Sequence, residues 1–302
     1  MYDICIIGAG IAGLTAVIYA RRAGLGAVLI EKNIFGGQMV ESAEIGNYPG
    51  IPSTTGPELA SAAYEQATAL GAEVIFDTVT AIEKTDGIWT LTGQAARYEA
   101  KAVIVANGAT HRKLGCEGEQ KFAQRGVSYC ATCDGSFYRG KRVAVVGGGN
   151  TALEDALFLA NLCERVYLIH RRDQFRGDKV LSDAVQEREN IELVLDSQVS
   201  RIIGEQRVSG AEVINKSGES RIIELSGVFV AVGVQPDTEL VSSIVKLDEG
   251  GYIIADENGE TGVEGLYAAG DCRSKRLRQI VTAAADGANA AFSASNYINQ
   301  MK

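Results

Sequence analysis

Short runs of consecutive apolar residues, most of them ending in glycine, recur along the chain. Residues 3–7 form one such run, and an alanine-rich segment to about Ala23 and a second apolar run at 27–30 follow it. The same succession returns between residues 142 and 169. Continuous apolar runs of this length are typical of buried parallel strands, and the segment between two of them is long enough for a crossover helix. The pattern therefore predicts two βαβ units.

Three further apolar runs end in glycine or in glycine and aspartate. They cover residues 103–108, 228–233 and 266–271, and the last leads into an alanine-rich segment, 280–291, that we expect to be helical. The first two runs come long after the two βαβ units, so each closes one unit after a long excursion. No third glycine-rich turn accompanies the last run, and we therefore assign it and its helix to the first unit.

These assignments predict the α/β fold class, with two Rossmann-like nucleotide-binding domains of three layers each (ββα). The second domain is inserted into the first, and two linkers connect them near residues 112–115 and 234–237. We expect the first domain to comprise residues 1–113 and 236–302, and the inserted domain to comprise residues 114–235.

A glycine-rich turn lies between strand and helix in both βαβ units. The turns are Gly8-Ala9-Gly10-Ile11-Ala12-Gly13 and Gly147-Gly148-Gly149-Asn150-Thr151-Ala152, and both match the pattern G-x-G-x-x-G/A. In this motif the first glycine permits the tight turn, the second lets a pyrophosphate approach the backbone, and the third lets the helix pack on the strand. Such turns also occur without a ligand, but two of them in this full context favour one dinucleotide site in each unit.

The residue that ends the second strand of each unit distinguishes the two sites. Glu31 and His170 follow the first glycine of their turns at the same offset. A carboxylate at this position accepts hydrogen bonds from a ribose diol and repels a 2′-phosphate, as in sites for FAD or NAD. The second site has His170-Arg171-Arg172 and Arg176 instead, and this cationic group suits the 2′-phosphate of NADPH. The alternative for these arginines is an ordinary solvated patch.

Two cysteines stand close together before the second turn, in the run Cys130-Ala131-Thr132-Cys133-Asp134. C-x-x-C spacing lets two sulfurs form a small disulfide and favours a reactive thiol, as redox cycling requires. Zinc is the main alternative, but a structural site needs four ligands, and the chain has no second C-x-x-C and only two histidines. We therefore expect a redox pair and no metal. Asp134 either donates a proton to a departing thiolate or caps the turn at Gly135.

Charge and composition exclude several other classes of protein. The 302 residues include 29 Lys and Arg against 38 Asp and Glu, which disfavours binding to nucleic acids and anionic membranes. Neither a secretion signal nor an apolar stretch of membrane-spanning length is evident, so we expect a cytoplasmic protein. Glycine occurs 35 times, against about 21 at average usage, and the surplus falls largely on the turns and strand ends. We expect the other four cysteines to be buried: Cys5, Cys116, Cys163 and Cys272.

A flavin-type site, an NADPH-type site and a dithiol together indicate one reaction. NADPH supplies a hydride, a flavin converts it into electrons that a disulfide can accept, and the C-x-x-C pair passes them on by thiol–disulfide exchange.

In these features the chain resembles the low-molecular-weight thioredoxin reductases. The run from Cys130 to Gly135 matches the active-site signature of that family, and the second turn with its histidine and arginines matches its NADPH-binding motifs. The resemblance spans nearly the whole chain, and the place of the cysteines separates it from the glutathione-reductase type. Three segments are similar to the flavin-contacting segments of the family: Gly36-Gly37-Gln38, Asn47-Tyr48-Pro49-Gly50, and Gly270-Asp271 with Arg278-Gln279.

The resemblance implies a homodimer that passes electrons from NADPH to FAD, then to a Cys130–Cys133 disulfide, and then to thioredoxin. It implies that Cys133 lies nearest the flavin, that Cys130 exchanges with thioredoxin, and that Asp134 donates the proton. It also implies that one domain rotates on the other between two steps of the reaction. The expected partner contacts are Arg125 and Phe137. The expected FAD-binding residues are Gly8, Gly10, Ile11, Ala12, Gly13, Glu31, Lys32, Gly36, Gly37, Gln38, Asn47, Gly108, Gly270, Asp271, Arg278, Gln279 and Ile280. The expected NADPH-binding residues are Gly147, Gly149, Asn150, Thr151, Ala152, His170, Arg171, Arg172, Arg176 and Gly233.

One departure from the family leaves the electron acceptor open. Many relatives carry paired aromatic residues after the aspartate and glycine of the signature, where this chain has Ser136-Phe137. The surface expected to receive thioredoxin is therefore smaller. A related flavin-dependent reductase with another acceptor is the alternative: a peroxidase partner, a small disulfide, ferredoxin or oxygen. A redox-sensing nucleotide-binding protein is a further alternative.

Overall fold

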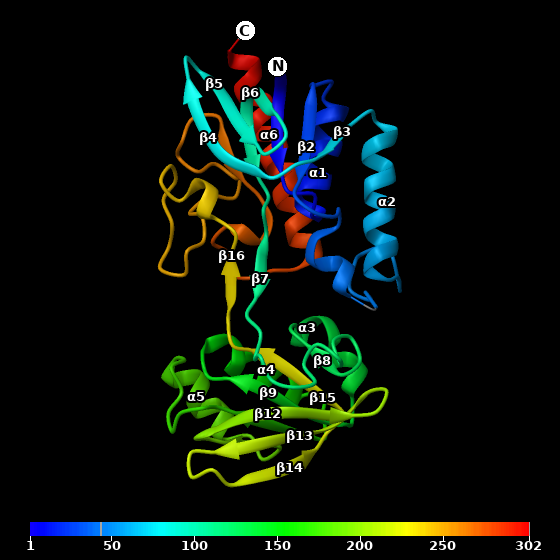
Figure 1. Ribbon diagram of the computed structural model, residues 1–302, viewed down its shortest axis with the longest axis vertical. Coiled ribbons are helices and arrows are strands. Elements are labelled where there is room, and N and C mark those ends of the chain that lie inside the picture. Colours follow the sequence, from blue (N-terminus) through cyan, green and yellow to red (C-terminus); the bar gives the residue numbers. More distant parts are fainter. Residues whose placement is uncertain (43, 302) are drawn as a thin grey trace. The chain divides into compact units, whose positions relative to one another are not determined.

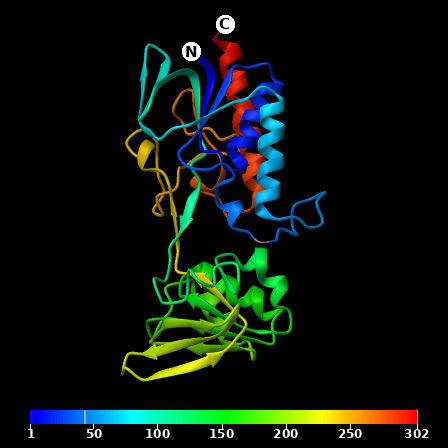
Figure 2. The ribbon, with the colours of Figure 1, turned by 45° about the vertical axis from the view of Figure 1, so that its right-hand side comes forward.

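The computed structural model of the chain describes residues 1–42 and 44–301. The chain divides into two compact units: Met1–Thr110 with Gln235–Lys302, called the first unit, and His111–Val234, called the inserted unit. Two short strands, β7 (Ala109–His111) and β16 (Val234–Pro236), pair with each other where the chain passes between the units (Figures 1 and 2). The polypeptide thus crosses from one unit to the other twice.

The first unit is built on a seven-stranded sheet. Its strands follow the order β3-β2-β1-β6-β5-β4, and β17 pairs with the end of β6. The pairs among β3, β2, β1, β6 and β17 are parallel, whereas β4, β5 and the start of β6 are antiparallel. The strands are β1 (Tyr2–Ile7), β2 (Ala27–Glu31), β3 (Glu73–Phe76), β4 (Val79–Thr85), β5 (Ile88–Gly93), β6 (Arg97–Val105) and β17 (Leu266–Ala268).

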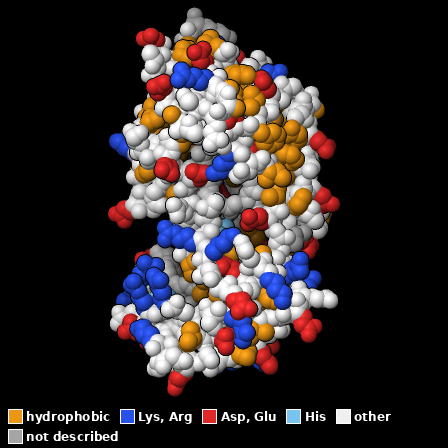
Figure 3. Space-filling model, viewed as in Figure 1, with side chains coloured by type: hydrophobic (Ala, Val, Ile, Leu, Met, Phe, Trp, Pro, Cys, Tyr) orange, Lys and Arg blue, Asp and Glu red, His pale blue; other side chains and the backbone are white. Residues whose placement is uncertain are grey.

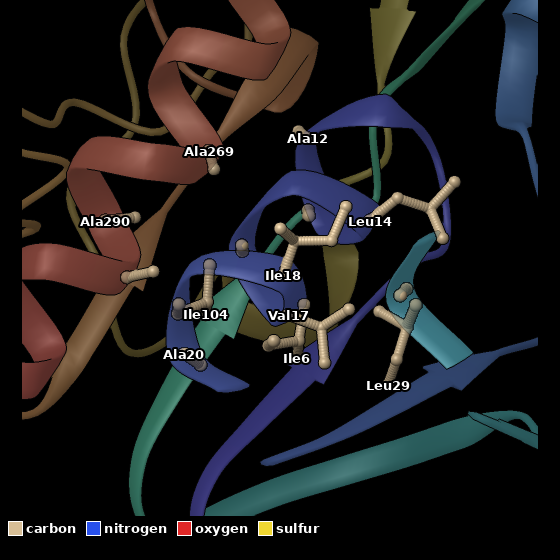
Figure 4. Packing of buried hydrophobic residues seen from close by; sticks show 14 of the residues in the cluster. Ile6, Ala12, Leu14, Val17, Ile18, Ala20, Leu29, Ile104, Ala269 and Ala290 are labelled. Carbon is tan, nitrogen blue, oxygen red and sulfur yellow. The ribbon is translucent and has the colours of Figure 1, made fainter. Parts of the chain in front are cut away.

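Two helices, α1 (Ile11–Arg22) and α6 (Ile280–Gln300), pack against each other and against this sheet. Figure 4 shows Leu14, Val17 and Ile18 of α1 in the buried cluster that they form with residues of β1 and β6. The two helices can approach closely because they meet through small residues. A Cβ on Gly287 of α6 would lie 2.1 Å from the carbonyl oxygen of Ala12. Helix α6 also extends beyond the end that the sequence indicated, from residue 291 to residue 300.

Helix α2 (Gly56–Ala69) has a clear local cause, although the hydrophobic pattern did not indicate it. Thr55 accepts the backbone N–H of Glu58 at 3.3 Å, and the Glu58 carboxylate accepts the N–H of Thr55 at 2.9 Å. This capping box satisfies N–H groups that the first turn of a helix leaves free. Three short 3-10 helices belong to the same unit: η1 (Gly37–Glu41), η3 (Glu239–Val241) and η4 (Gly270–Cys272).

The inserted unit has three layers. Its parallel sheet has the order β11-β10-β9-β15-β8, and α4 (Asn150–Ala160) packs on one face of it. An antiparallel sheet, β12-β13-β14, contributes side chains to the cluster on the other face. The strands are β8 (Val127–Ser128), β9 (Arg142–Gly147), β10 (Arg165–Ile169), β11 (Ile191–Val194), β12 (Ser197–Gly204), β13 (Val208–Asn215), β14 (Ser220–Glu224) and β15 (Gly227–Ala231); the remaining helices are α3 (Ala131–Asp134), η2 (Gly135–Tyr138) and α5 (Lys179–Gln186).

The two parallel sheets repeat the same arrangement. In the first unit β1 lies between β2 and β6, with Ile7 opposite Ile30. In the inserted unit β9 lies between β10 and β15, with Val146 opposite Ile169. Strand β17 beside β6 and strand β8 beside β15 occupy equivalent places, although they stand at opposite ends of their units in the sequence. The predicted α/β class with two Rossmann-like units is confirmed.

Candidate active site

The backbone of the first glycine-rich turn is tightly packed on one side and open on the other. Gly8 has a φ of +101°, and a Cβ there would lie 2.4 Å from the carbonyl oxygen of Ala106. A Cβ on Gly13 would lie 1.8 Å from the carbonyl oxygen of Gly8. Around the Cβ position of Gly10, by contrast, no described atom lies within 4 Å. Open backbone at the N-terminus of α1 is what a pyrophosphate requires.

Glu31 ends β2 beside this turn and is only 8% exposed. Its Oε2 accepts the backbone N–H of Ala9 at 2.7 Å, and its Oε1 accepts the N–H of Asn33 at 2.8 Å. These two bonds fix the carboxylate in one orientation. Because each carboxylate oxygen has a second lone pair, the group can still accept hydrogen bonds from ribose hydroxyls.

Segments distant in sequence gather around the first turn. The N–H of Gly36 donates to the carbonyl of Ala9 at 2.7 Å, and a Cβ on Gly270 would meet the Cβ of Ala12 at 2.9 Å. The side chains of Asn47 and Gln279 are joined by a hydrogen bond of 3.0 Å. Residues 10, 36, 47, 270 and 279 were all expected to contact one flavin nucleotide, and Gln279 is the residue before α6.

Other residues expected at this site have partners of their own. Lys32 forms an ion pair with Asp237 at 2.6 Å and is largely exposed. The guanidinium of Arg278 lies 3.9 Å from the centre of the Tyr252 ring. Gln38 lies in η1, Ile280 begins α6, and Gly108 has a φ of +72° and accepts the N–H of Asp237 at 3.1 Å.

A buried charge cluster that the sequence did not indicate supports Gly270 and Asp271. The Asp286 carboxylate accepts the N–H of Gly270 at 3.0 Å and the ammonium of Lys275 at 2.9 Å. Arg273 lies 3.3 Å from the same carboxylate, and Lys275 lies 3.3 Å from Asp271. Since Arg273 and Asp286 are almost fully buried, their opposite charges must compensate each other.

The second glycine-rich turn repeats the geometry of the first. A Cβ on Gly147 would lie 2.3 Å from the carbonyl oxygen of Ala231, and no described atom lies within 4 Å of the Cβ position of Gly149. Thr151 is exposed and Ala152 is buried at the start of α4. Gly233 has a φ of +117° and its carbonyl accepts the N–H of Arg112 at 2.9 Å.

His170 packs directly beneath this turn. Its ring atoms lie 2.3 Å from the position that a Cβ on Gly148 would take, and the ring stacks on Phe175 with centroids 5.6 Å apart. Burial lowers the pKa of His170, and the neighbouring Arg176, Arg171 and Arg172 lower it further. The imidazole is therefore neutral at pH 7 and leaves the positive charge of this site to the arginines.

The three arginines lie on the loop between β10 and α5. Arg171, Arg172 and Arg176 are exposed, and Figure 3 shows Lys and Arg side chains gathered on the inserted unit beside α5. The N–H of Arg176 donates to the carbonyl of Gly148 at 2.7 Å, which brings the loop against the glycine-rich turn. The Asn150 side chain, which we expected to contact the coenzyme, is hydrogen-bonded to Asp178.

Cys130 and Cys133 form a disulfide just beyond β8. Cys130 caps the short helix α3, and the N–H of Cys133 donates to the Cys130 sulfur at 3.2 Å. The Thr132 hydroxyl lies 3.4 Å from the same sulfur. Since β8 is parallel to β15 and β9, the disulfide lies at the edge of the sheet where the glycine-rich turn also begins. Ligands of parallel α/β sheets bind at this edge.

Asp134 follows the disulfide and is half-buried, whereas its neighbour Ser128 is buried. Burial raises the pKa of Asp134, while a hydrogen bond from Ser128 opposes the shift. Ser128 also accepts the N–H of Cys130 at 3.1 Å. Within the described chain the Asp134 carboxylate makes no capping hydrogen bond to η2, so the capping alternative finds no support in the geometry.

Three of the other cysteines, Cys5, Cys163 and Cys272, are buried as expected, whereas Cys116 is only partly buried. The expectation for Cys116 was wrong, since Cys116 is only a partly buried neighbour of the hydrophobic cluster between the two sheets of the inserted unit. Among residues 1–42 and 44–301 no three His, Cys, Asp or Glu side chains gather as metal ligands. No helix in the same ranges combines the length and the apolar character needed to cross a membrane.

Two Rossmann-like units, one of which carries a C-x-x-C disulfide, define a disulfide oxidoreductase with two dinucleotide sites. Residues 2–287 match the model of the pyridine nucleotide-disulphide oxidoreductases, and the chain belongs to this family. It is 40% identical over 304 residues to the thioredoxin reductase of Listeria monocytogenes, and the match covers 100% of this chain and 95% of the relative. It is 42% identical over 309 residues to the thioredoxin reductase of Peptoclostridium litorale, with 100% of this chain and 98% of the relative covered.

The fold agrees with solved structures of the same family. The crystal structure of thioredoxin reductase from Streptococcus pyogenes superimposes with a TM-score of 0.96 at 41% identity, covering 99% of both chains. The resemblance inferred from the sequence motifs is therefore confirmed. Thioredoxin reductases of this family use FAD and NADPH.

Proposed function

We propose that the chain is an NADPH-dependent thioredoxin reductase. The observation that carries the proposal is the Cys130–Cys133 disulfide at the ligand-binding edge of the sheet whose turn and arginines suit NADPH. FAD, bound to the first unit, supplies the carrier that accepts a hydride from NADPH and passes two electrons to a disulfide.

In the first unit, the turn at Gly8, Gly10 and Gly13 receives the pyrophosphate of FAD, and Glu31 receives its adenosine ribose. The fit rests on the open backbone at Gly10 and on the fixed carboxylate of Glu31. Asn47, Gln279 and the N-terminus of α6 hold the flavin end, and the charge cluster around Asp286 keeps Gly270 and Asp271 in place.

In the inserted unit, the turn from Gly147 to Ala152 receives the pyrophosphate of NADPH, and Arg171, Arg172 and Arg176 receive its 2′-phosphate. The open backbone at Gly149 and the exposed arginines support this assignment. The neutral, buried ring of His170 serves as a spacer beneath the turn.

Thiol exchange balances as follows once the dithiol is reduced. The Cys130 thiolate attacks one sulfur of the acceptor disulfide, and a mixed disulfide forms as the acceptor S–S bond breaks. The departing thiolate takes a proton from Asp134, whose pKa is raised by burial. Cys133 then gives its thiol proton to the Asp134 carboxylate and attacks the Cys130 sulfur, which restores the Cys130–Cys133 disulfide. The departing acceptor thiolate takes that proton and leaves as the second acceptor thiol. The N–H of Cys133 points at the Cys130 sulfur and stabilises a thiolate there.

Thioredoxin is the proposed acceptor, and Arg125 and Phe137 are the proposed contacts. Both side chains are exposed, and Phe137 lies in η2 directly after the disulfide helix. We also propose that the enzyme is a homodimer in the cytoplasm, which sedimentation of the purified protein tests for the oligomeric state.

The proposal is tested by NADPH oxidation in the presence of oxidised thioredoxin. Wild-type protein should turn over, and Cys130→Ser should abolish the thioredoxin-dependent rate because no mixed disulfide forms. Cys116→Ser is the matched control, since Cys116 is also partly exposed but is not part of the disulfide. Unchanged turnover of Cys130→Ser would refute the proposed exchange step.

The second candidate function is the same redox chemistry with an electron acceptor other than thioredoxin. Its support is the small hydrophilic Ser136 beside Phe137, where a larger aromatic surface would be expected to receive thioredoxin. Comparison of kcat/KM for thioredoxin, small disulfides, a peroxidase partner, ferredoxin and oxygen decides between the candidates. If thioredoxin is the acceptor, Ser136→Phe should preserve or raise kcat/KM for it.

A further inference from the structure

The arginine loop of the inserted unit is attached to the glycine-rich turn at two places. The N–H groups of Arg176 and Gly177 donate to the carbonyl oxygen of Gly148 at 2.7 and 3.2 Å. Two residues further, the N–H of Asp178 donates to Asn150 Oδ1 at 2.7 Å, and Asn150 Nδ2 donates to Asp178 Oδ2 at 3.0 Å. The side chain of Asn150 therefore uses both its acceptor and its donor on the loop.

Asp178 does not cap helix α5 with its side chain, although its position is that of a capping residue. It is the N-cap residue of α5, where an aspartate normally accepts a backbone N–H of the first helical turn and stabilises the helix. Among the residues that the structure describes, no N–H of α5 bonds to its carboxylate. The carboxylate is turned instead towards Asn150, the first residue of α4.

The loop is also pressed against α4. A Cβ on Gly177 would lie 2.6 Å from Leu153 Cδ1 and 2.8 Å from Asn150 Oδ1, so a larger residue there would displace these side chains. Leu153 is fully buried. The path of the loop from Arg176 to Asp178 is therefore defined by contacts to the start of α4.

We propose that Asn150 and Asp178 are positioning residues for coenzyme specificity. Their paired hydrogen bonds hold the arginine loop at a fixed distance from the glycine-rich turn, so that one molecule of NADPH meets both with its 2′-phosphate and its pyrophosphate. A site that is already arranged loses less conformational freedom when the ligand binds. The charge of Asp178 itself repels a phosphate, and its benefit must come from the position of the loop. The inference rests on the proposed binding of NADPH to this unit.

The test is calorimetric titration of the FAD-loaded enzyme with 2′,5′-ADP and with 5′-AMP, which differ only in the 2′-phosphate. Asn150→Ala removes both side-chain bonds and should weaken 2′,5′-ADP binding by about 5- to 10-fold, as expected for the loss of one to two net hydrogen bonds. Binding of 5′-AMP should change by less than about 2-fold, since Asn150→Ala leaves the backbone N–H groups of the glycine-rich turn unchanged.

Two further variants distinguish the effect of the position of the arginine loop from the effect of the negative charge of Asp178. Asp178→Asn keeps a donor and an acceptor for Asn150 and removes one negative charge, so it should bind 2′,5′-ADP at least as tightly as wild type. Asp173→Asn removes a negative charge from the same loop and is the matched control for that effect. The circular dichroism and flavin absorbance of each variant report on its fold.

Equal weakening of both ligands in Asn150→Ala would overturn the inference, because the amide would then contact the shared part of the coenzyme. An unchanged preference in Asn150→Ala, or a lost preference in Asp178→Asn, would also overturn it. Wild-type enzyme that does not prefer 2′,5′-ADP over 5′-AMP would refute the proposed NADPH site itself and this inference with it.

Discussion

The two glycine-rich turns differ at their second position for a reason that lies outside the turn. In the first unit this position is Ala9, because Glu31 reaches only its N–H, at 2.7 Å, and leaves room for a Cβ. In the inserted unit it is Gly148, because the His170 ring fills the space that a Cβ would need. The residue that selects the ribose thus also determines which residues the turn tolerates.

The third small position shows the opposite difference. Gly13 has no room for a Cβ, which would lie 1.8 Å from the carbonyl oxygen of Gly8. Ala152, at the corresponding position of the inserted unit, accommodates its Cβ and is fully buried. Helix α1 therefore approaches its turn more closely than α4 does.

The acids that follow the equivalent strands β17 and β8 also have different neighbours. Asp271 has the ammonium of Lys275 at 3.3 Å, whereas Asp134 has the hydroxyl of Ser128. A cation stabilises a carboxylate far more than a hydroxyl does. The neutral hydroxyl beside Asp134 suits a proton donor in the inserted unit.

The largest expected effect on stability comes from exchanging the third small residue of the two glycine-rich turns, Gly13 and Ala152. Gly13→Ala should lower the free energy of unfolding of the first unit by about 3 kcal/mol, the upper end of overpacking penalties, and should release FAD. The reverse change, Ala152→Gly, should cost only about 1 kcal/mol of helix stability. Urea unfolding followed by flavin fluorescence and circular dichroism measures both. Similar losses in the two variants would contradict the difference in helix approach.

The next effect concerns the residues that select the coenzyme. Replacing Arg171 and Arg172 together by Ala should raise KM for NADPH by about 10- to 100-fold, because charge-assisted bonds to a phosphate are lost. KM for NADH should hardly change. Steady-state kinetics measures KM for both coenzymes. An equal increase of KM for NADPH and for NADH would refute the assignment of the arginines to the 2′-phosphate.

A smaller effect on stability is expected at the second position of the glycine-rich turns, which is Gly148 in the inserted unit and Ala9 in the first unit. Gly148→Ala should displace the His170 ring and lower the free energy of unfolding by about 1 to 2 kcal/mol. Ala9→Gly, the matched change in the first unit, should cost less than about 1 kcal/mol, since only backbone freedom and one methyl group are involved. Thermal unfolding of the two variants compares them. A harmless Gly148→Ala would mean that His170 does not restrict the turn.

The smallest effect is a shift in pH dependence. Only protonated Asp134 donates a proton, so turnover with a disulfide should fall as the pH rises through its raised pKa. Ser128→Ala removes the hydrogen bond that opposes the effect of burial, so the pKa of Asp134 should rise further and the falling limb should move to higher pH. The pH profile of kcat/KM for oxidised thioredoxin reports this shift, and Asp134→Asn should lack the limb. A limb that stays in place in Ser128→Ala would argue against the coupling.

Features encoded in a few neighbouring residues could be predicted from the sequence. The two turns, the paired positions Glu31 and His170, and the C-x-x-C run all depend on local spacing, and the strands around them are continuous apolar runs. The disulfide follows directly from the spacing of Cys130 and Cys133.

Features that depend on distant contacts could not be predicted. Asp286 supports Gly270 from a helix that begins ten residues later, and nothing in the local sequence of α6 indicates that contact. The sequence alone indicates that Asp178 is an ordinary helix cap, and only the structure shows its contact with Asn150. The second β layer was expected, but the individual strands of the sheet β12-β13-β14 were not located, because many of their residues are exposed and their apolar pattern is weak.

The central claim is that FAD and the Cys130–Cys133 disulfide act in series, and anaerobic visible spectroscopy tests it most directly. NADPH should bleach the flavin absorbance of wild-type protein and of Cys130→Ser alike, because hydride transfer does not need the dithiol. Oxidised thioredoxin added afterwards should restore the absorbance of wild type but not that of Cys130→Ser. Protein that does not bleach with NADPH, or a Cys130→Ser variant that thioredoxin reoxidises as fast as wild type, would contradict the account.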